Sequence, residues 1–162
     1  MSAAGRATLG LVLACTTWFA ATAVPAHVAS PALLAAAVPL GFAAGGLTSA
    51  WRGWPERVPP RRLAWNGARL VALANLVPAV IDGAAVLVAS RTGVGAALAL
   101  VYPAVLQMAA ADAAGRPGRV LGAVIAALTI GSAGPHLIRA LGVTAWRPML
   151  VATSVAVLVG GA

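Results

Sequence analysis

Residues 65–89, WNGARLVALANLVPAVIDGAAVLVA, carry charged side chains only at Arg69 and Asp82. A mostly apolar run of about 18 or more residues is typical of a helix that crosses the hydrocarbon core of a membrane. The composition of the whole 162-residue chain agrees, because 61% of its residues are hydrophobic and 9% are charged. A soluble domain is nearer to half apolar and one quarter charged. The sequence therefore predicts an all-α membrane protein.

Similar apolar runs flank this stretch. The run at residues 7–28 follows a basic residue, as in a secretory signal, but it is long for a signal and other spans follow, so we expect a retained helix. We expect a turn at Ser90–Gly93 to close the third span. The last run is short and contains Arg147 and Pro148. The chain therefore predicts a polytopic bundle of five to six transmembrane helices, at residues 7–28, 31–51, 65–89, 94–111, 120–138 and 143–159.

The longest polar link, GWPERVPPRRLA at residues 53–64, holds the densest group of arginines. Its prolines exclude a continuous helix. Trp51, Trp54 and Trp65 bracket it, as aromatic rings do at the level of the lipid headgroups. A cytoplasmic N-terminus leaves three arginines outside, Arg91, Arg139 and Arg147, and places seven inside, Arg6, Arg52, Arg57, Arg61, Arg62, Arg116 and Arg119. This orientation obeys the positive-inside rule, so we expect it.

All eleven basic residues are arginine, in a chain rich in Ala, Gly, Val and Pro. This bias indicates a GC-rich genome, and we expect the inner membrane of a bacterium. The net charge of the chain is +8, and a strong positive charge is also typical of nucleic-acid-binding proteins. However, these arginines lie in short turns between apolar runs. We therefore expect the lipid bilayer, and no nucleic acid, as a partner.

Small residues at a spacing of four mark places where membrane helices can approach closely. This spacing occurs at Gly41 and Gly45, at Gly118 and Gly122, and at Ala110 and Ala114. In a chain this rich in Ala and Gly, each match is either a contact or a chance spacing. Three prolines lie well inside predicted spans: Pro39, Pro78 and Pro103. They indicate either broken helices around a central cavity or simple kinks.

Asp82 is the most informative single residue, because an ionisable group deep in a span is costly and usually marks an ion or substrate path. Asn75 lies seven residues earlier and shares its helix face. We expect both on a pathway that takes a cation or a proton, together with Trp18, Tyr102 and Gln107. The alternative places Asp82 near the outer interface, close to Arg91.

Catalytic and metal-binding motifs are missing from the sequence. Cys15 is the single cysteine, so neither an internal disulfide nor a zinc cluster can form from cysteines. His27 and His136 have no metal-ligand neighbour at helical spacing. No G-x-S-x-G, H-E-x-x-H or pair of intramembrane acids occurs. We therefore expect no enzyme activity, no cofactor and no metal.

The segment ASRTGVGAALALVYPAVLQMAAADAAGRPGRVLGAVIAALTIGSAG, residues 89–134, resembles the end of an EamA-type repeat of the drug/metabolite transporter superfamily. In that family a small-residue turn leads into an Ala/Leu-rich fourth helix with a proline, and a charged turn precedes a Gly-containing fifth helix. These features match Thr92–Gly95, Pro103 and Arg116–Arg119, and Trp18 matches a tryptophan of the first helix. The resemblance implies a five-helix repeat at residues 7–138, with an additional segment at 139–162.

Full-length members resemble two inverted repeats, so this chain resembles a half-size member that acts with a second copy or with a separate second half. The resemblance implies a transporter, or half-transporter, of small organic solutes or metabolites. It would work by alternating access, with proton coupling as one option. The alternative is a non-transporting membrane subunit that scaffolds or stabilises a partner complex.

Overall fold

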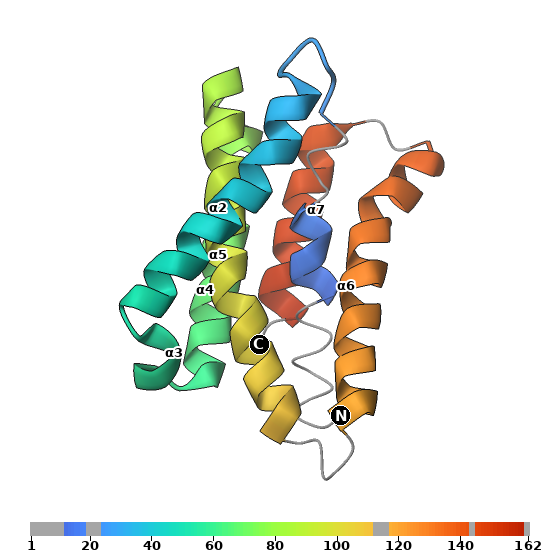
Figure 1. Cartoon of the computed structure of the whole chain (residues 1–162). Helices are drawn as coiled ribbons and strands as arrows, with labels where there is room; N and C mark the ends of the chain where they lie inside the picture. Colours follow the sequence, from blue (N-terminus) through green and yellow to red (C-terminus); the bar gives the residue numbers. More distant parts are fainter. Residues whose placement is uncertain (1–11, 19–23, 112–116, 143–144, 161–162) are drawn as a thin grey trace.

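A computed structural model describes residues 12–18, 24–111, 117–142 and 145–160. These residues form helices joined by short links, with no strand among them. After a helical segment at 12–18, the helices are α2 (Pro31–Trp51), α3 (Trp54–Arg57), α4 (Pro60–Val80), α5 (Ala84–Ala111), α6 (Pro117–Ala140) and α7 (Trp146–Gly160) (Figure 1). The predicted all-α class is confirmed.

Four of these helices are long and apolar enough to cross a membrane: α2, α4, α5 and, from Leu121, α6. Helix α7 is apolar but shorter, at 15 residues. Much of the predicted first span lies outside the described residues, and so do Arg6, Arg116 and Ala114. The count of five to six spans therefore stays a prediction, whereas four membrane-compatible helices are established.

The boundary between the third and fourth predicted spans was wrong. Helix α4 ends at Val80, and α5 begins at Ala84 and continues through the predicted turn at Ser90–Gly93. The chain turns at Gly83 instead, whose φ of +135° favours a residue without a Cβ atom. Inside α5 the Thr92 hydroxyl donates to the carbonyl of Val88 at 3.0 Å, so this turn-forming residue is accommodated within the helix.

The link after α2 is not a continuous helix, as its prolines predicted. Helix α3 covers four residues, Val58 is extended, and α4 begins at Pro60. Arg52 stacks on Trp54 at 5.5 Å, and Arg69 stacks on Trp65 at 4.5 Å. Each guanidinium thus lies over a ring near one end of the bundle, as expected of side chains at a membrane interface.

Helix α5 is the central element, since α2 and α4 both pack along it (Figure 1). A Cβ atom at Gly45 would lie 2.6 Å from the carbonyl oxygen of Ala96, and one at Gly41 would overlap the backbone of Thr92. Of the two interpretations left open for Gly41 and Gly45, the structure shows the contact: these glycines form a close-approach face of α2 on α5. A Cβ atom at Gly118 or Gly122 would meet no atom of the described residues within 4 Å, so that pair marks no such contact among them.

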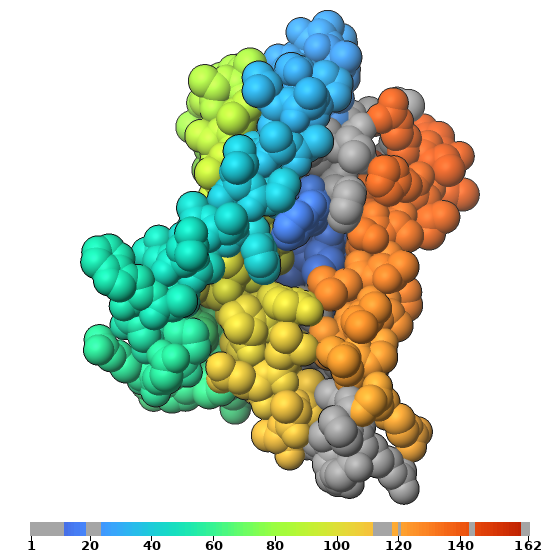
Figure 2. Space-filling view, in the orientation of Figure 1, coloured from blue at the N-terminus to red at the C-terminus, as the bar shows by residue number. Residues whose placement is uncertain are grey.

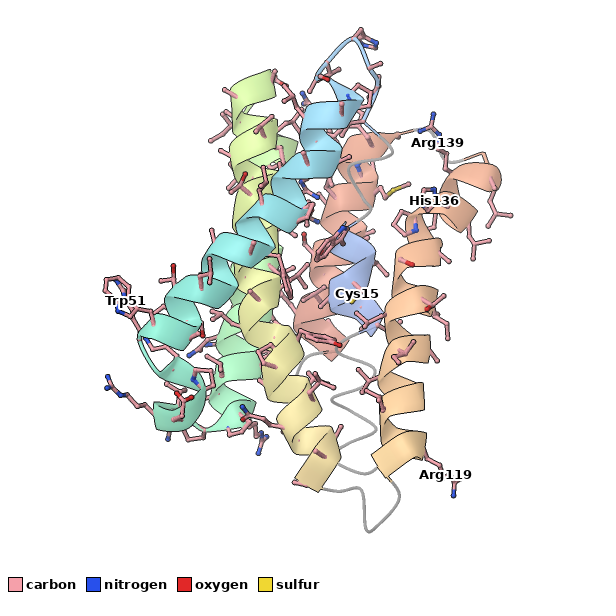
Figure 3. All side chains as sticks on the ribbon, viewed as in Figure 1. Cys15, Trp51, Arg119, His136 and Arg139 are labelled. Carbon is pink, nitrogen blue, oxygen red and sulfur yellow. The ribbon has the colours of Figure 1, made fainter. Side chains whose placement is uncertain are left out.

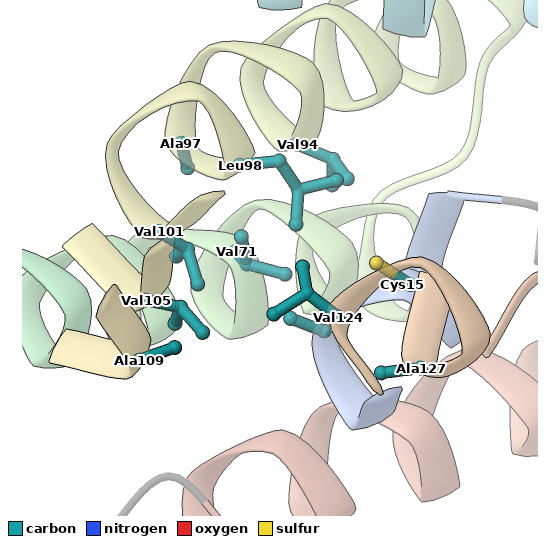
Figure 4. Close-up of a cluster of buried hydrophobic side chains, with 11 residues drawn as sticks. Cys15, Val71, Val94, Ala97, Leu98, Val101, Val105, Ala109, Val124 and Ala127 are labelled. Atoms are coloured by element: carbon teal, nitrogen blue, oxygen red, sulfur yellow. The ribbon is translucent and has the colours of Figure 1, made fainter. Parts of the chain in front are cut away.

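Residues 12–18 lie between α2, α5 and α6 in the space-filling view (Figure 2). A Cβ atom at Gly131 on α6 would lie 2.5 Å from the carbonyl oxygen of Val12. The main apolar core joins this segment, α4, α5 and α6 through Cys15, Val71, Val101 and Val124, among others (Figure 4). Large apolar side chains also cover the outside of the helices, including Leu40, Leu47, Leu73, Ile125 and Val155. Such a surface suits contact with lipid.

Candidate functional site

Two polar residues face each other deep in the bundle, Asn75 on α4 and Arg91 on α5, with exposed fractions of 0% and 1%. Helices α4 and α5 run antiparallel, because only residues 81–83 separate them. At 1.5 Å per residue, Asn75 lies about 8 Å before the end of α4, and Arg91 lies about 10 Å after the start of α5. The antiparallel packing therefore brings the two side chains to the same depth.

The Arg91 guanidinium donates to several oxygens. Its Nη1 donates to the backbone carbonyl of Thr17 at 3.0 Å, and its Nη2 donates to Asn75 Oδ1. A longer contact of 3.3 Å joins Nη2 to the hydroxyl of Ser90. The Nε–H group is buried and has no hydrogen-bond partner among the described residues. Arg91 thus links α5 to α4 and to residues 12–18, and only three of its five N–H donors have an acceptor in the described part of the chain.

The Asn75 amide group connects the same cluster to α7. Its Nδ2 lies 2.9 Å from the carbonyl oxygen of Leu150, 3.0 Å from Thr153 Oγ1 and 3.0 Å from Ser154 Oγ. An amide NH₂ has two hydrogens, so at most two of these three acceptors bind well at one time. These bonds orient Asn75 with its carbonyl oxygen toward Arg91. We call Thr17, Asn75, Ser90, Arg91, Thr153 and Ser154 the buried polar cluster.

Ser90 has a second role in this cluster. A proline cannot donate the helix hydrogen bond to the carbonyl four residues earlier, so Pro78 leaves the carbonyl of Ala74 without its usual partner. The Ser90 hydroxyl donates to that carbonyl at 2.7 Å. A side chain of α5 therefore satisfies the backbone group that the proline in α4 releases, as an apolar environment requires.

No carboxylate among the residues that the structure describes neutralises Arg91. The sequence has three acidic residues, Glu56, Asp82 and Asp112. Glu56 is exposed on α3, at the opposite end of α4. Asp82 is exposed and forms an ion pair with Arg147. Asp112 follows α5, whose last residue lies about 30 Å from Arg91 along the helix axis. The cluster therefore holds an uncompensated positive charge.

This structure changes the expected position of Asp82. The sequence predicted a position deep in a span, but α4 ends two residues before Asp82, and the Asp82 side chain is 78% exposed in the link to α5. Its partner is Arg147 at the start of α7. The span was predicted to end at residue 89, nine residues after the observed end of α4 at Val80. This error placed Asp82, a residue of the link, inside the predicted span.

The other four predicted pathway residues fall in three places. Asn75 lies in the buried polar cluster. Trp18 and Tyr102 both pack on Phe42, with ring centroids 5.6 and 6.5 Å apart, and form an aromatic row across three elements. Gln107 lies on an exposed position of α5. The structure therefore brings Trp18 and Tyr102 into one group and leaves Gln107 outside it.

Sequence reasoning missed Arg91, which is the centre of the cluster. The residues Ser-Arg-Thr-Gly are typical of a turn, and this pattern concealed a helical arginine. A signal was present, because three acids cannot each neutralise one of eleven arginines, so most arginines of the chain have no carboxylate partner. The chain matches no family model and no curated protein.

Proposed function

We propose that the chain is an integral membrane transporter, or half-transporter, that moves a small organic solute by alternating access. The observation that carries the proposal is the buried polar cluster, which lies between separate helices whose outer faces are apolar. Polar groups at such depth in membrane proteins usually mark a solute or ion path. Hydrogen bonds between side chains of different helices can also be exchanged for bonds to a solute when the helices move.

The helix order supports an EamA-type arrangement as part of this proposal. The segment at 12–18 and helices α2, α4, α5 and α6 keep the expected succession, although the boundary between the third and fourth helices moves to residues 81–83. A second copy or a separate second half then completes the pathway. Light scattering on the purified particle tests this, because a dimer has about twice the chain mass of 15.9 kDa.

The proposed location is the inner membrane of a bacterium, with a cytoplasmic N-terminus. Arg119 lies at one end of the bundle, and His136 and Arg139 lie toward the other (Figure 3). The link after Trp51 leads to the start of α4, which is at the Arg119 end because α4 and α5 run antiparallel. The Arg119 end therefore also carries the arginines of the link after α2, namely Arg52, Arg57, Arg61 and Arg62. The opposite end carries Arg139 and Arg147, the latter paired with Asp82. The positive-inside rule then assigns the Arg119 end to the cytoplasm.

Cysteine labelling tests this orientation. The native Cys15 is buried and should not react. An Arg57→Cys or Arg139→Cys variant therefore carries a single accessible thiol, at the substituted position. In intact spheroplasts, a membrane-impermeant maleimide should label the cysteine at 139 and should reach the one at 57 only after permeabilisation. Labelling of the cysteine at 57 in intact spheroplasts would reverse the proposed orientation.

Uptake into proteoliposomes tests transport itself. The probes are labelled succinate, choline and glucose, which represent an anion, a cation and a neutral solute of similar size. Saturable uptake of one probe above that of protein-free vesicles supports the proposal. If none of the three enters and the chain co-purifies with a larger membrane enzyme, the non-transporting subunit is the better description.

A further inference from the structure

We infer that Arg91 binds a carboxylate or phosphate group of the solute, so that the transported class is small organic anions. This inference rests on the proposed transport function and deepens it by naming the substrate chemistry. It starts from the charge of the buried polar cluster. Arg91 is 1% exposed, and the two acidic residues that the structure describes, Glu56 and Asp82, are exposed elsewhere.

A guanidinium without a counter-charge is costly to bury in an apolar environment. Its present partners are all neutral: a backbone carbonyl, an amide and a hydroxyl. Such groups lower the cost of burial but do not balance the charge. An anion from outside the chain would balance it, and a charge-assisted bond is about twice as strong as a neutral one.

The geometry leaves one edge of the guanidinium for that anion. Nε–H has no partner, and the neighbouring Nη2 makes its second contact with Ser90 at 3.3 Å, beyond the usual hydrogen-bond range. An oxyanion that bridges Nε and Nη2 would gain two charge-assisted bonds in exchange for one neutral contact of Nη2. The Ser90 hydroxyl would keep its own bond to the Ala74 carbonyl.

Asn75 acts as a positioning residue for this edge. Its Oδ1 accepts from Nη2, and its Nδ2 is held by oxygens of α7, so the planar guanidinium cannot rotate freely. The cluster is closed in the arrangement described here. Alternating access supplies the opening, because separation of residues 12–18 or of α7 from α4 and α5 would uncover the Nε–Nη2 edge.

Thermal unfolding of the purified full chain in a neutral detergent tests anion binding. Succinate and inorganic phosphate are titrated at constant ionic strength, with choline and glucose as non-anionic controls. We expect at least one anion to raise the melting temperature of the parent chain in a saturable way. Arg91→Met should abolish this response. Arg91→Lys keeps the charge but loses the planar edge, and it should raise the half-saturating concentration roughly tenfold or more.

Arg69→Met is the matched control, because Arg69 is an exposed arginine on α4 that stacks on Trp65 outside the cluster. It should respond to anions like the parent chain. An unchanged anion response in Arg91→Met would overturn the inference, and so would equal stabilisation by choline or glucose. If Arg91→Met does not fold, Arg91→Lys decides the matter, because an unshifted half-saturating concentration in that variant also overturns it.

A lipid phosphate has the same chemistry, and a separate arm distinguishes it. The chain is reconstituted in phosphatidylcholine vesicles with or without phosphatidylglycerol. Stabilisation by phosphatidylglycerol that depends on Arg91, without any effect of soluble anions, would assign the edge to lipid and overturn the solute assignment.

Uptake measurements separate the two proposals. Succinate uptake that Arg91→Met abolishes supports both of them. Anion-dependent stabilisation without uptake of any probe would keep the anion site and overturn transport. Uptake of choline or glucose that Arg91→Met leaves unchanged would keep transport and overturn the anion site.

Discussion

Asn75→Ala removes the side chain that joins α4 to both Arg91 and α7, and we expect it to lower the free energy of unfolding by about 3–4 kcal/mol. Two neutral bonds from Nδ2 contribute roughly 0.6 kcal/mol each, the average measured for side-chain bonds between membrane helices. The bond from Arg91 is charge-assisted and contributes about 1.5–3 kcal/mol.

The assay is reversible unfolding in dodecyl maltoside micelles with increasing dodecyl sulfate, followed by the helical circular dichroism signal. Asn66→Ala is the control, since Asn66 is exposed on the same helix and its loss should change the unfolding free energy by less than about 0.5 kcal/mol. If the two variants differ by less than 1 kcal/mol, the cluster does not connect α4 to its neighbours, and the reasoning fails.

Three further predictions follow from the same contacts. Arg91→Met should leave the unfolding free energy within about 1 kcal/mol of the parent value or raise it, because it removes an uncompensated buried charge. Gly45→Ala should cost about 1–3 kcal/mol through overlap with the backbone of α5, whereas Gly46→Ala, with no atom within 4 Å, should stay within about 1 kcal/mol. Asp82→Asn should cost less than about 1 kcal/mol and leave solute uptake unchanged, because its ion pair is exposed. The unfolding free energy of all four variants is measured in the same mixed micelles. For Asp82→Asn, solute uptake into proteoliposomes is measured in addition.

Each prediction has a clear contrary result. A loss of several kcal/mol in Arg91→Met would mean that Arg91 serves mainly to hold the helices together. Equal stabilities of the two glycine variants would mean that α2 and α5 do not approach as closely as described. A change in uptake or in its pH dependence on Asp82→Asn would restore the expected role of that carboxylate in the pathway.

The sequence alone was sufficient to predict α2, whose two ends are marked by a proline and a tryptophan. The span expected at 31–51 coincides with α2, which begins at Pro31 and ends at Trp51. The third span was misplaced, because the apolar run continues from α4 through the link into α5 with only Asp82 and Gly83 to interrupt it. Hydropathy does not locate a short link inside a continuous apolar run.

The site was predictable only in part, for a different reason. Asn75 was visible as a polar residue in an apolar helix, but its partners come from α5 and α7, far away in sequence. Local spacing does not show which helices pack together. The glycine pairs make the same point, because Gly41 and Gly45 meet α5 whereas Gly118 and Gly122 have the same spacing and meet nothing within 4 Å. The partner helix decides between them.

The bond from Ser90 to the Ala74 carbonyl has an evolutionary consequence. Pro78 is tolerable because a hydroxyl on another helix serves the carbonyl that it releases. The two positions are therefore epistatic: the effect of a substitution at one depends on the residue at the other. A lineage that lost Ser90 first would pass through a less stable intermediate, whereas one that first replaced Pro78 with alanine would regain the helix bond and leave position 90 free to vary.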